Sequence, residues 1–212
     1  DTAQSIYEGI KHPLTIRELS DMTGVAISYL NSNYRLPKPV AKITQNYVAV
    51  DANPYAEAIY QSKETELPTF VQFEDETSQI DAIIDIISKK KMKSVGILVP
   101  NNEKILSIMK SFDERNFVCE FKYNAGYNDK RNRDTLDFTT DKPKLMTYHS
   151  AKGLQFETVI LPFYEGATDK DLRKPLYVAM TRTYRYLYVM YSGISIAQPL
   201  QQVPEYLYMK EL

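Results

Sequence analysis

The sequence contains no tryptophan, a single cysteine (Cys119) and only two histidines. One cysteine excludes an internal disulfide and a cysteine-based zinc site, and is typical of a reducing compartment, so we expect a cytoplasmic protein without a metal site of its own. Seven glycines are spread singly along the chain, and no Gly-x-x-x-x-Gly-Lys-Ser/Thr phosphate-binding loop occurs. The chain therefore cannot cradle a nucleoside triphosphate alone.

Long apolar runs and an excess of one charge are also missing. No apolar stretch reaches the roughly 20 residues of a membrane-spanning helix, and the start of the chain lacks a signal-peptide pattern, so we expect no membrane partner. The net charge is -1, so any contact with nucleic acid must come from a local patch. With 43% hydrophobic and 25% charged residues among 212, the composition is that of a globular protein with ample core.

Strand and helix patterns alternate through the middle of the chain. In order, they are a strand at Phe70–Glu74, a helix with Ile80, Ile83, Ile84 and Ile87 on one face, a buried strand at Ser94–Val99, a helix capped by Asn101 with Ile105, Ile108, Met109 and Phe112 on one face, and a strand at Phe117–Tyr123. This alternation predicts an α/β fold, a parallel sheet with helices packed on it. Ligands of such sheets bind beyond the carboxyl ends of the strands.

Similar patterns flank this region. They predict a short helix at Leu14–Val25 ending at Gly24, strands at Ile27–Leu30, Lys144–Thr147, Glu157–Pro162 and Tyr186–Tyr191, and a helix with Leu172, Leu176 and Met180 on one face and Arg182 in its last turn. Residues 53–68 and 124–142 are polar connectors. We divide the chain into an N-terminal segment, residues 1–52, that packs on an α/β domain, residues 53–212.

Two polar segments beside predicted strands carry the strongest motifs. Thr147 to Leu154 reads Thr-Tyr-His-Ser-Ala-Lys-Gly-Leu, and Tyr177 to Arg182 reads Tyr-Val-Ala-Met-Thr-Arg. They resemble motifs V and VI of the UvrD/Rep-type superfamily 1 helicases. Earlier stretches resemble motif III (Asp1, Gln4, Ser5, Ile6, Tyr7) and motif IV (Asn33-Tyr34-Arg35) of the same family. The resemblance implies a RecA-like fold, the second motor domain of a helicase, with helices on both faces of the sheet.

The resemblance also implies roles for individual residues. Single-stranded DNA would contact Thr147, His149 and Lys152, and also Asn101 in the turn after the strand at Ser94–Val99. The family usually has an arginine near this turn, where this chain has Pro100, Asn101 and Asn102. A nucleotide would contact Gln4, Tyr34, Arg35, Gly153, Gln155 and Arg182. Among these, Gln4, Arg35 and Arg182 would act catalytically on the terminal phosphate.

Physical chemistry fits two of these roles. The planar guanidinium of an arginine binds phosphate oxygens through parallel N–H donors, which lysine cannot reproduce, and a tyrosine ring offers a face to adenine. Each residue also has an ordinary structural reading. Gln4 would then be a solvated polar side chain near a chain end, Arg35 a surface residue beside a half-buried Tyr34, and His149 a satisfied structural histidine. Arg185, a strand-edge residue, is the alternative to Arg182.

The chain opens at Asp1 without methionine, so we expect a piece of a longer protein. By resemblance, a preceding RecA-like domain would bring the phosphate loop and most ligands of Mg²⁺, and ATP would lie between the two domains. The connectors are too short for the large helical insertion usual in this family. The predicted function is the C-terminal motor domain of an ATP-dependent DNA helicase or translocase, inactive alone. A non-enzymatic scaffold and an RNA-directed motor are the alternatives, since Glu8–Ile10, Pro100 and Gln155 depart from the family pattern.

Overall fold

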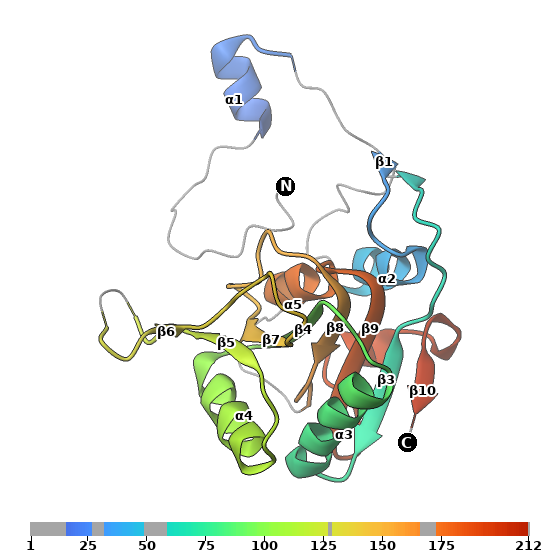
Figure 1. The fold of residues 1–212 in the computed structure, drawn as a ribbon. Helices are drawn as coiled ribbons and strands as arrows, with labels where there is room; N and C mark the ends of the chain where they lie inside the picture. Colours follow the sequence, from blue (N-terminus) through green and yellow to red (C-terminus); the bar gives the residue numbers. More distant parts are fainter. Residues whose placement is uncertain (1–15, 27–31, 49–58, 127–128, 166–172, 212) are drawn as a thin grey trace.

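The structure is a computed structural model that describes residues 16–26, 32–48, 59–126, 129–165 and 173–211. Its helices and strands alternate along most of the chain (Figure 1). In chain order the elements are α1 (Ile16–Thr23), β1 (Ser32–Asn33), α2 (Lys38–Ile43), the π-helical turn η2 (Thr44–Val48), β2 (Ile59–Tyr60), β3 (Thr69–Phe73), α3 (Glu76–Lys89), β4 (Val95–Val99), α4 (Asn102–Glu114), β5 (Glu120–Tyr123), β6 (Arg133–Asp134), β7 (Lys144–Thr147), β8 (Phe156–Leu161), α5 (Arg173–Met180), β9 (Thr183–Ser192), the 3₁₀ turns η3 (Leu200–Gln202) and η4 (Glu205–Leu207), and β10 (Met209–Glu211).

One sheet of 8 strands organises the domain, in the order β10-β3-β9-β8-β4-β7-β5-β6. Its strand pairs run parallel, apart from the antiparallel pairing of β5 with the short edge strand β6. The strand β4 lies between β7 and β8, and each of its residues is buried. The parallel sheet predicted from the sequence is therefore confirmed.

Helices cover both faces of this sheet, each over its own apolar cluster. In Figure 1, α3 and α4 lie on one face, and α2 and α5 lie on the other. The first cluster contains the isoleucines of α3 and α4 together with Ile97 and Leu145. The second contains the apolar residues of α2 and α5 together with Leu98 and Met146. Neighbouring residues of one strand thus point into opposite cores, as the two-residue strand period requires.

Side-chain caps define the starts of the two long helices. The carboxylate of Asp75 accepts a hydrogen bond from the Ser78 backbone N–H (2.7 Å), and the amide oxygen of Asn101 accepts one from Lys104 N–H (3.1 Å). These bonds satisfy donors that the first turn of a helix leaves unpaired. The predicted cap at Asn101 is confirmed. It fixes the turn that follows β4 at the carboxyl edge of the sheet.

A close contact between two strands accounts for the glycine inside β4. A Cβ atom on Gly96 would lie 2.6 Å from a ring carbon of Phe156. The Phe156 ring, only 1% exposed, therefore packs directly against the β4 backbone. This contact sets the start of β8 close to β4.

Several predicted boundaries need correction. The strand predicted at Phe117–Tyr123 begins only at Glu120, because Phe117 N–H bonds back to Phe112 O in the turn that follows α4. The strand β9 already begins at Thr183, before the predicted start. Helix α5 ends at Met180, so Arg182 lies in the turn beyond it rather than in its last turn. The predicted strand at residues 27–30 lies outside the described residues.

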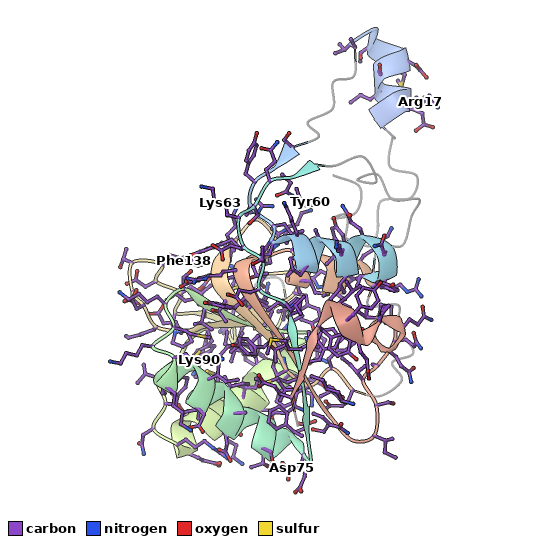
Figure 2. The ribbon with its side chains drawn as sticks, turned by 90° about the vertical axis from the view of Figure 1, so that its right-hand side faces the viewer. Arg17, Tyr60, Lys63, Asp75, Lys90 and Phe138 are labelled. Atoms are coloured by element: carbon purple, nitrogen blue, oxygen red, sulfur yellow. The ribbon has the colours of Figure 1, made fainter. Side chains whose placement is uncertain are left out.

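The two N-terminal helices differ in how they pack on the rest of the chain. Helix α2 belongs to the core, since Val40 and Ile43 are fully buried in the cluster shared with α5. Helix α1, which carries Arg17, stands apart from the layered body in both views (Figures 1 and 2). The proposed domain boundary after residue 52 falls among undescribed residues and stays a prediction. In the part of the chain that the structure describes, the helices are too short or too polar to cross a membrane.

Candidate nucleic-acid and nucleotide interface

The segment between β7 and β8 crosses one face of the sheet from its carboxyl edge to its amino edge. Tyr148 and Ala151 anchor it, because both are buried in the cluster shared with α2 and α5. Tyr148 N–H also donates to Val99 O (2.9 Å), which ties the segment to the end of β4. The side chains of His149 and Lys152 are exposed. The sequence therefore buries two anchors three residues apart and leaves His149 and Lys152 facing outward.

A pocket of about 610 Å³ opens at the carboxyl ends of β4 and β7. Its lining brings together the four residues that the sequence predicted for nucleic acid: Asn101, Thr147, His149 and Lys152. The other lining residues are Pro100, Asn102, Lys122, Asn124 and Ser150. As the structure describes it, this lining contains two ammonium groups, five side-chain hydroxyl or amide groups, one imidazole and no acidic side chain. Such a surface suits an anionic, hydrogen-bonding ligand.

Hydrogen bonds within the protein hold the rim of this pocket. The hydroxyl of Thr147 accepts a bond from Ser150 N–H (3.2 Å) and donates one to Ser150 Oγ (3.1 Å). The side-chain oxygen of Asn101 is occupied as the cap of α4. Thr147 and Asn101 therefore shape the turns of this rim, and the side chains of His149 and Lys152 are exposed on it.

The predicted nucleotide residues Gly153, Gln155 and Arg182 lie toward the other edge, before the starts of β8 and β9. Gly153 and Gln155 are exposed. Gly153 has φ +89 with open space around it, a backbone conformation that favours glycine. Phe156 N–H donates to Arg182 O (2.9 Å), so the segments of the two motifs are joined directly.

Arg182 is only 3% exposed. Its Nε donates to Val178 O (2.9 Å), its Nη2 to Thr181 Oγ1 (3.0 Å) and its Nη1 to Leu154 O (3.5 Å). In this conformation the guanidinium binds the end of α5 and the segment between β7 and β8, which we call the crossover segment. To contact a phosphate, the guanidinium must leave these neutral oxygen acceptors and donate to a charged phosphate oxygen instead. Hydrogen bonds to a charged acceptor are the stronger ones.

Arg185, the alternative to Arg182, is engaged in a different way. Its Nη1 donates to Glu157 Oε1 (3.0 Å), its Nε lies 3.5 Å from Glu64 Oε2, and its guanidinium stacks over the Tyr186 ring. The hydrogen bond to Glu157 raises the pKa of Arg185 above its ordinary value. These contacts are those of an arginine that braces the start of β9.

The turn before α2 carries Tyr34 and Arg35. The side-chain oxygen of Asn33 accepts from both Arg35 N–H and Leu36 N–H (3.0 Å each), so the turn is fixed. The Tyr34 side chain is exposed at 68%, whereas Arg35 is half-buried and its buried Nε has no hydrogen-bond partner among the described residues. An exposed ring beside an arginine with an unused donor fits a nucleotide. Gln4, the third predicted phosphate contact, lies outside the described residues.

Carboxylate ligands for a metal are not gathered in the described ranges. Within them, no group of three or more His, Cys, Asp or Glu side chains is placed to hold a metal ion. The residues present therefore fit a nucleotide better than they fit the Mg²⁺ that would accompany it.

Sequence reasoning missed Lys122 and Asn124 as members of the pocket. Both come from the end of β5, which pairs with β7 in the sheet. Local patterns predict a strand here, but they do not say which strand lies beside it. The neighbouring Asn101 was predicted as a nucleic-acid contact, whereas Asn102 was not.

A comparison with known protein families finds a match to one family model. The model of the UvrD-like helicase C-terminal domain family matches residues 144–190. This stretch contains Thr147, His149, Lys152, Gly153, Gln155 and Arg182, and thus both polar segments described above. No curated protein matches the sequence of the chain.

The fold resembles that of one solved helicase C-terminal domain. The C-terminal domain of a possible DNA helicase from Lactobacillus plantarum WCFS1 matches with a TM-score of 0.61 at 16% identity, over 84% of this chain and 99% of that one. The PRRSV helicase gives 0.47 at 8% identity, over 81% of this chain and 31% of that one. Arterivirus nonstructural protein 10, a helicase solved with DNA, gives 0.45 at 10% identity, over 68% of this chain and 34% of that one. The chain spans about a third of the length of these two viral proteins.

Proposed function

We propose that this chain, a UvrD-like helicase C-terminal domain with a RecA-like fold, is the second motor domain of an ATP-dependent DNA helicase or translocase. In this proposal it contacts single-stranded DNA at the carboxyl edge of its sheet. It completes an ATP site together with a first RecA-like domain of the same protein. We place this activity in the cytoplasm, with no membrane partner.

One observation carries the proposal. Asn101 follows β4, whereas Thr147, His149 and Lys152 come from the end of β7 and the turn after it. All four line one pocket without an acidic neighbour in its described lining. The family resemblance predicts contacts with nucleic acid for these residues. Their meeting in one pocket supports a strand that lies across the ends of β4 and β7.

The nucleotide side of the proposal rests on the turn before α2 and on the turn after α5. Tyr34 would lie against the adenine, and Arg35 would donate its unused Nε–H to a phosphate. The bound ATP, with Mg²⁺ held mainly by the first domain, would supply the phosphoryl group whose transfer drives movement. Gln4, Gly153, Gln155 and Arg182 remain part of this proposed site.

The crossover segment offers a physical link between the two sides. It begins at Thr147 beside the pocket and ends at Leu154, whose carbonyl oxygen accepts from Arg182 Nη1. If Arg182 leaves this acceptor for a phosphate, the end of the segment loses a contact while its start lies against DNA. We propose that the segment thereby couples nucleotide binding to the grip on the strand.

A non-enzymatic scaffold is the second candidate. The burial of Arg182 favours it, because an arginine bonded inside the protein also explains the motif as a structural feature. Substitution of Arg182 separates the two candidates and is argued in the Discussion.

Binding of single strands tests the proposed contact. We expect His149→Ala and Lys152→Ala each to weaken binding of a fluorescent deoxythymidine oligonucleotide about threefold to tenfold, since each removes one hydrogen bond or charge contact. Lys89→Ala is the matched control, because Lys89 is an exposed lysine at the end of α3, paired with Asp85. Fluorescence anisotropy gives the affinities. Equal affinities for wild type and both pocket variants would rule out the proposed DNA contact at His149 and Lys152. Stronger binding of an RNA oligonucleotide would favour an RNA-directed motor.

A further inference from the structure

Lys122 lies in the pocket although it belongs to neither polar segment nor to any stretch that resembles a helicase motif. It comes from β5, whose Phe121 pairs with Leu145 of β7. Phe121 and Tyr123 pack against the core shared with α3 and α4. Because side chains alternate along a strand, Lys122 points to the opposite face, and its side chain is 40% exposed there.

The corner around Lys122 is preformed. Asn102 Nδ2 donates to Asn124 O (2.7 Å), and Asn124 N–H donates to Asn102 Oδ1 (3.4 Å). This reciprocal pair joins the end of β5 to the start of α4, so two elements of the pocket wall move together. A ligand at this corner meets Lys122 without prior ordering of the backbone, which lowers the cost of binding.

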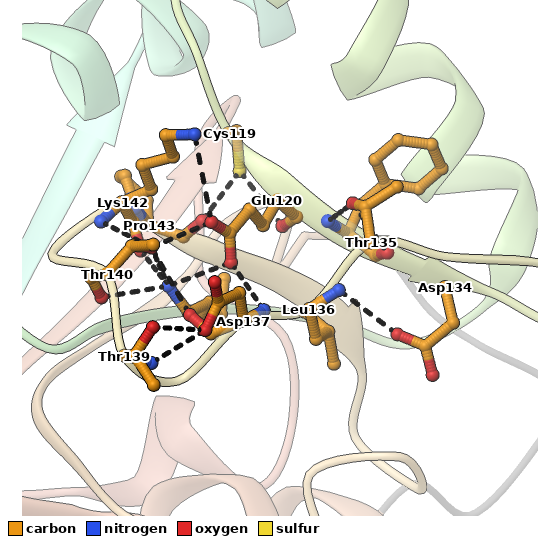
Figure 3. A network of polar contacts seen from close by, with 12 residues as sticks. Cys119, Glu120, Asp134, Thr135, Leu136, Asp137, Thr139, Thr140, Lys142 and Pro143 are labelled. Carbon is orange, nitrogen blue, oxygen red and sulfur yellow. Dashed lines mark hydrogen bonds and ion pairs between the residues drawn. The ribbon is translucent and has the colours of Figure 1, made fainter.

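The charge of Lys122 is available to a ligand at low cost. Its Nζ lies 3.2 Å from Asp134 Oδ2, and the two side chains are 40% and 51% exposed. An ion pair this exposed is weak, so an incoming phosphate competes with it readily. Asp134 is also held by Leu136 N–H, which donates to its Oδ1 (3.2 Å; Figure 3).

We propose that Lys122 binds a backbone phosphate of the single strand, and that Asp134 opposes this contact as a competing counter-ion. The inference rests on the proposed function and extends its DNA path from the Thr147–Lys152 turn onto β5. Among the described residues that line the pocket there is no phenylalanine, tyrosine or tryptophan, and the ring present is the imidazole of His149. Lys122 itself offers only a charge, so its contact is to the sugar-phosphate backbone and independent of sequence.

The test measures single-strand affinity of the 212-residue chain as a function of salt. We expect Lys122→Ala to weaken binding roughly fivefold to tenfold near 50 mM salt, and to lower the slope of log K against log salt by about 0.7, the value for one contact to a single strand. The loss should be the same for oligothymidine and for a mixed-sequence oligonucleotide.

Asp134→Asn gives the opposite change. Asparagine keeps an oxygen for Leu136 N–H and removes only the charge beside Lys122. We expect affinity to rise by up to about fivefold, the equivalent of an exposed ion pair, and we expect no such rise when Lys122 is alanine. Lys110→Ala is the matched control, since Lys110 is 82% exposed and also lies near an acidic partner, Glu114.

The outcomes separate this inference from the proposed function. Weakening by His149→Ala without any change in Lys122→Ala would overturn the contact at β5 and leave the proposed function standing. An unchanged affinity in Asp134→Asn would overturn the role of Asp134. Absence of single-strand binding by the wild-type chain, with its melting curve intact, would overturn both the inference and the proposed DNA contact.

Discussion

The proposed motor function predicts that Arg182→Ala abolishes DNA-stimulated ATP hydrolysis in a protein that joins this chain to a first RecA-like domain. We expect a loss of roughly 10³–10⁵ in rate, the contribution of an arginine that stabilises charge on a transferring phosphoryl group. Arg182→Lys should be nearly as inactive, because an ammonium group cannot present two parallel N–H donors. Steady-state phosphate release, with and without single-stranded DNA, measures the effect.

The burial of Arg182 makes a stability control necessary. Alanine also removes the donors to Val178 O and Thr181 Oγ1, so we expect a loss of about 1–3 kcal/mol of folding free energy. Arg185→Ala is the matched control: it breaks the contact to Glu157 and should leave hydrolysis within a few-fold of wild type. Hydrolysis at an ordinary rate in folded Arg182→Ala would rule out the motor role and favour the scaffold.

The second large effect concerns the buried ion pair of Glu120 and Lys144. Their charged atoms lie 3.0 Å apart, and the residues are 6% and 3% exposed. Figure 3 shows how Glu120 also accepts from Asp137 N–H and from the Thr140 hydroxyl (2.7 Å each). We expect Glu120→Ala to cost about 3–5 kcal/mol, because it leaves the Lys144 ammonium buried without its counter-ion. Urea denaturation measures the change.

Two comparisons sharpen this prediction. Asp85→Ala breaks the exposed pair with Lys89 and should cost less than about 1 kcal/mol. The double variant Glu120→Gln with Lys144→Met removes both charges, and should be more stable than Glu120→Ala. A cost for Glu120→Ala no larger than that of Asp85→Ala would show that the buried pair contributes little.

The same carboxyl gives a pH dependence of definite sign. Burial raises the pKa of Glu120, but hydrogen bonds from Thr140, Asp137 and Lys144 outweigh it and hold the pKa below its ordinary value. A carboxyl whose pKa is lowered by folding stabilises the fold at pH values above its pKa in the unfolded chain, which is about 4.3 for glutamate. This stabilisation is lost as the pH falls through the pKa of Glu120 in the folded state. The stability difference between wild type and Glu120→Ala should therefore shrink in acid.

Local pattern was sufficient to predict much of the fold. The isoleucine spacing of α3 and the apolar run of β4 predicted their elements, and Asn101 was correctly identified as a helix cap. These features depend on residues near one another in sequence, which is why periodicity and capping chemistry reveal them. The parallel arrangement followed from the alternation of strands and helices.

Features that depend on distant contacts were not predictable in this way. The pairing of β5 with β7 brings Lys122 into the pocket, and β10 adds to the edge of the sheet beside β3. The enclosure of Arg182 by Leu154 and Val178 likewise arises from the meeting of two segments. No local pattern states which strands become neighbours, so these residues had to be found in the structure.

The proposed division of the ATP site has one direct test, which is ATP hydrolysis by this chain alone and by the protein extended to include its first RecA-like domain. Each is assayed with and without single-stranded DNA. We predict no hydrolysis by the chain alone, since its sequence contains no phosphate-binding loop, and hydrolysis by the extended protein that DNA stimulates. Hydrolysis by the chain alone, or silence of the folded extended protein in the presence of DNA, would contradict the proposal that this domain is half of a DNA motor.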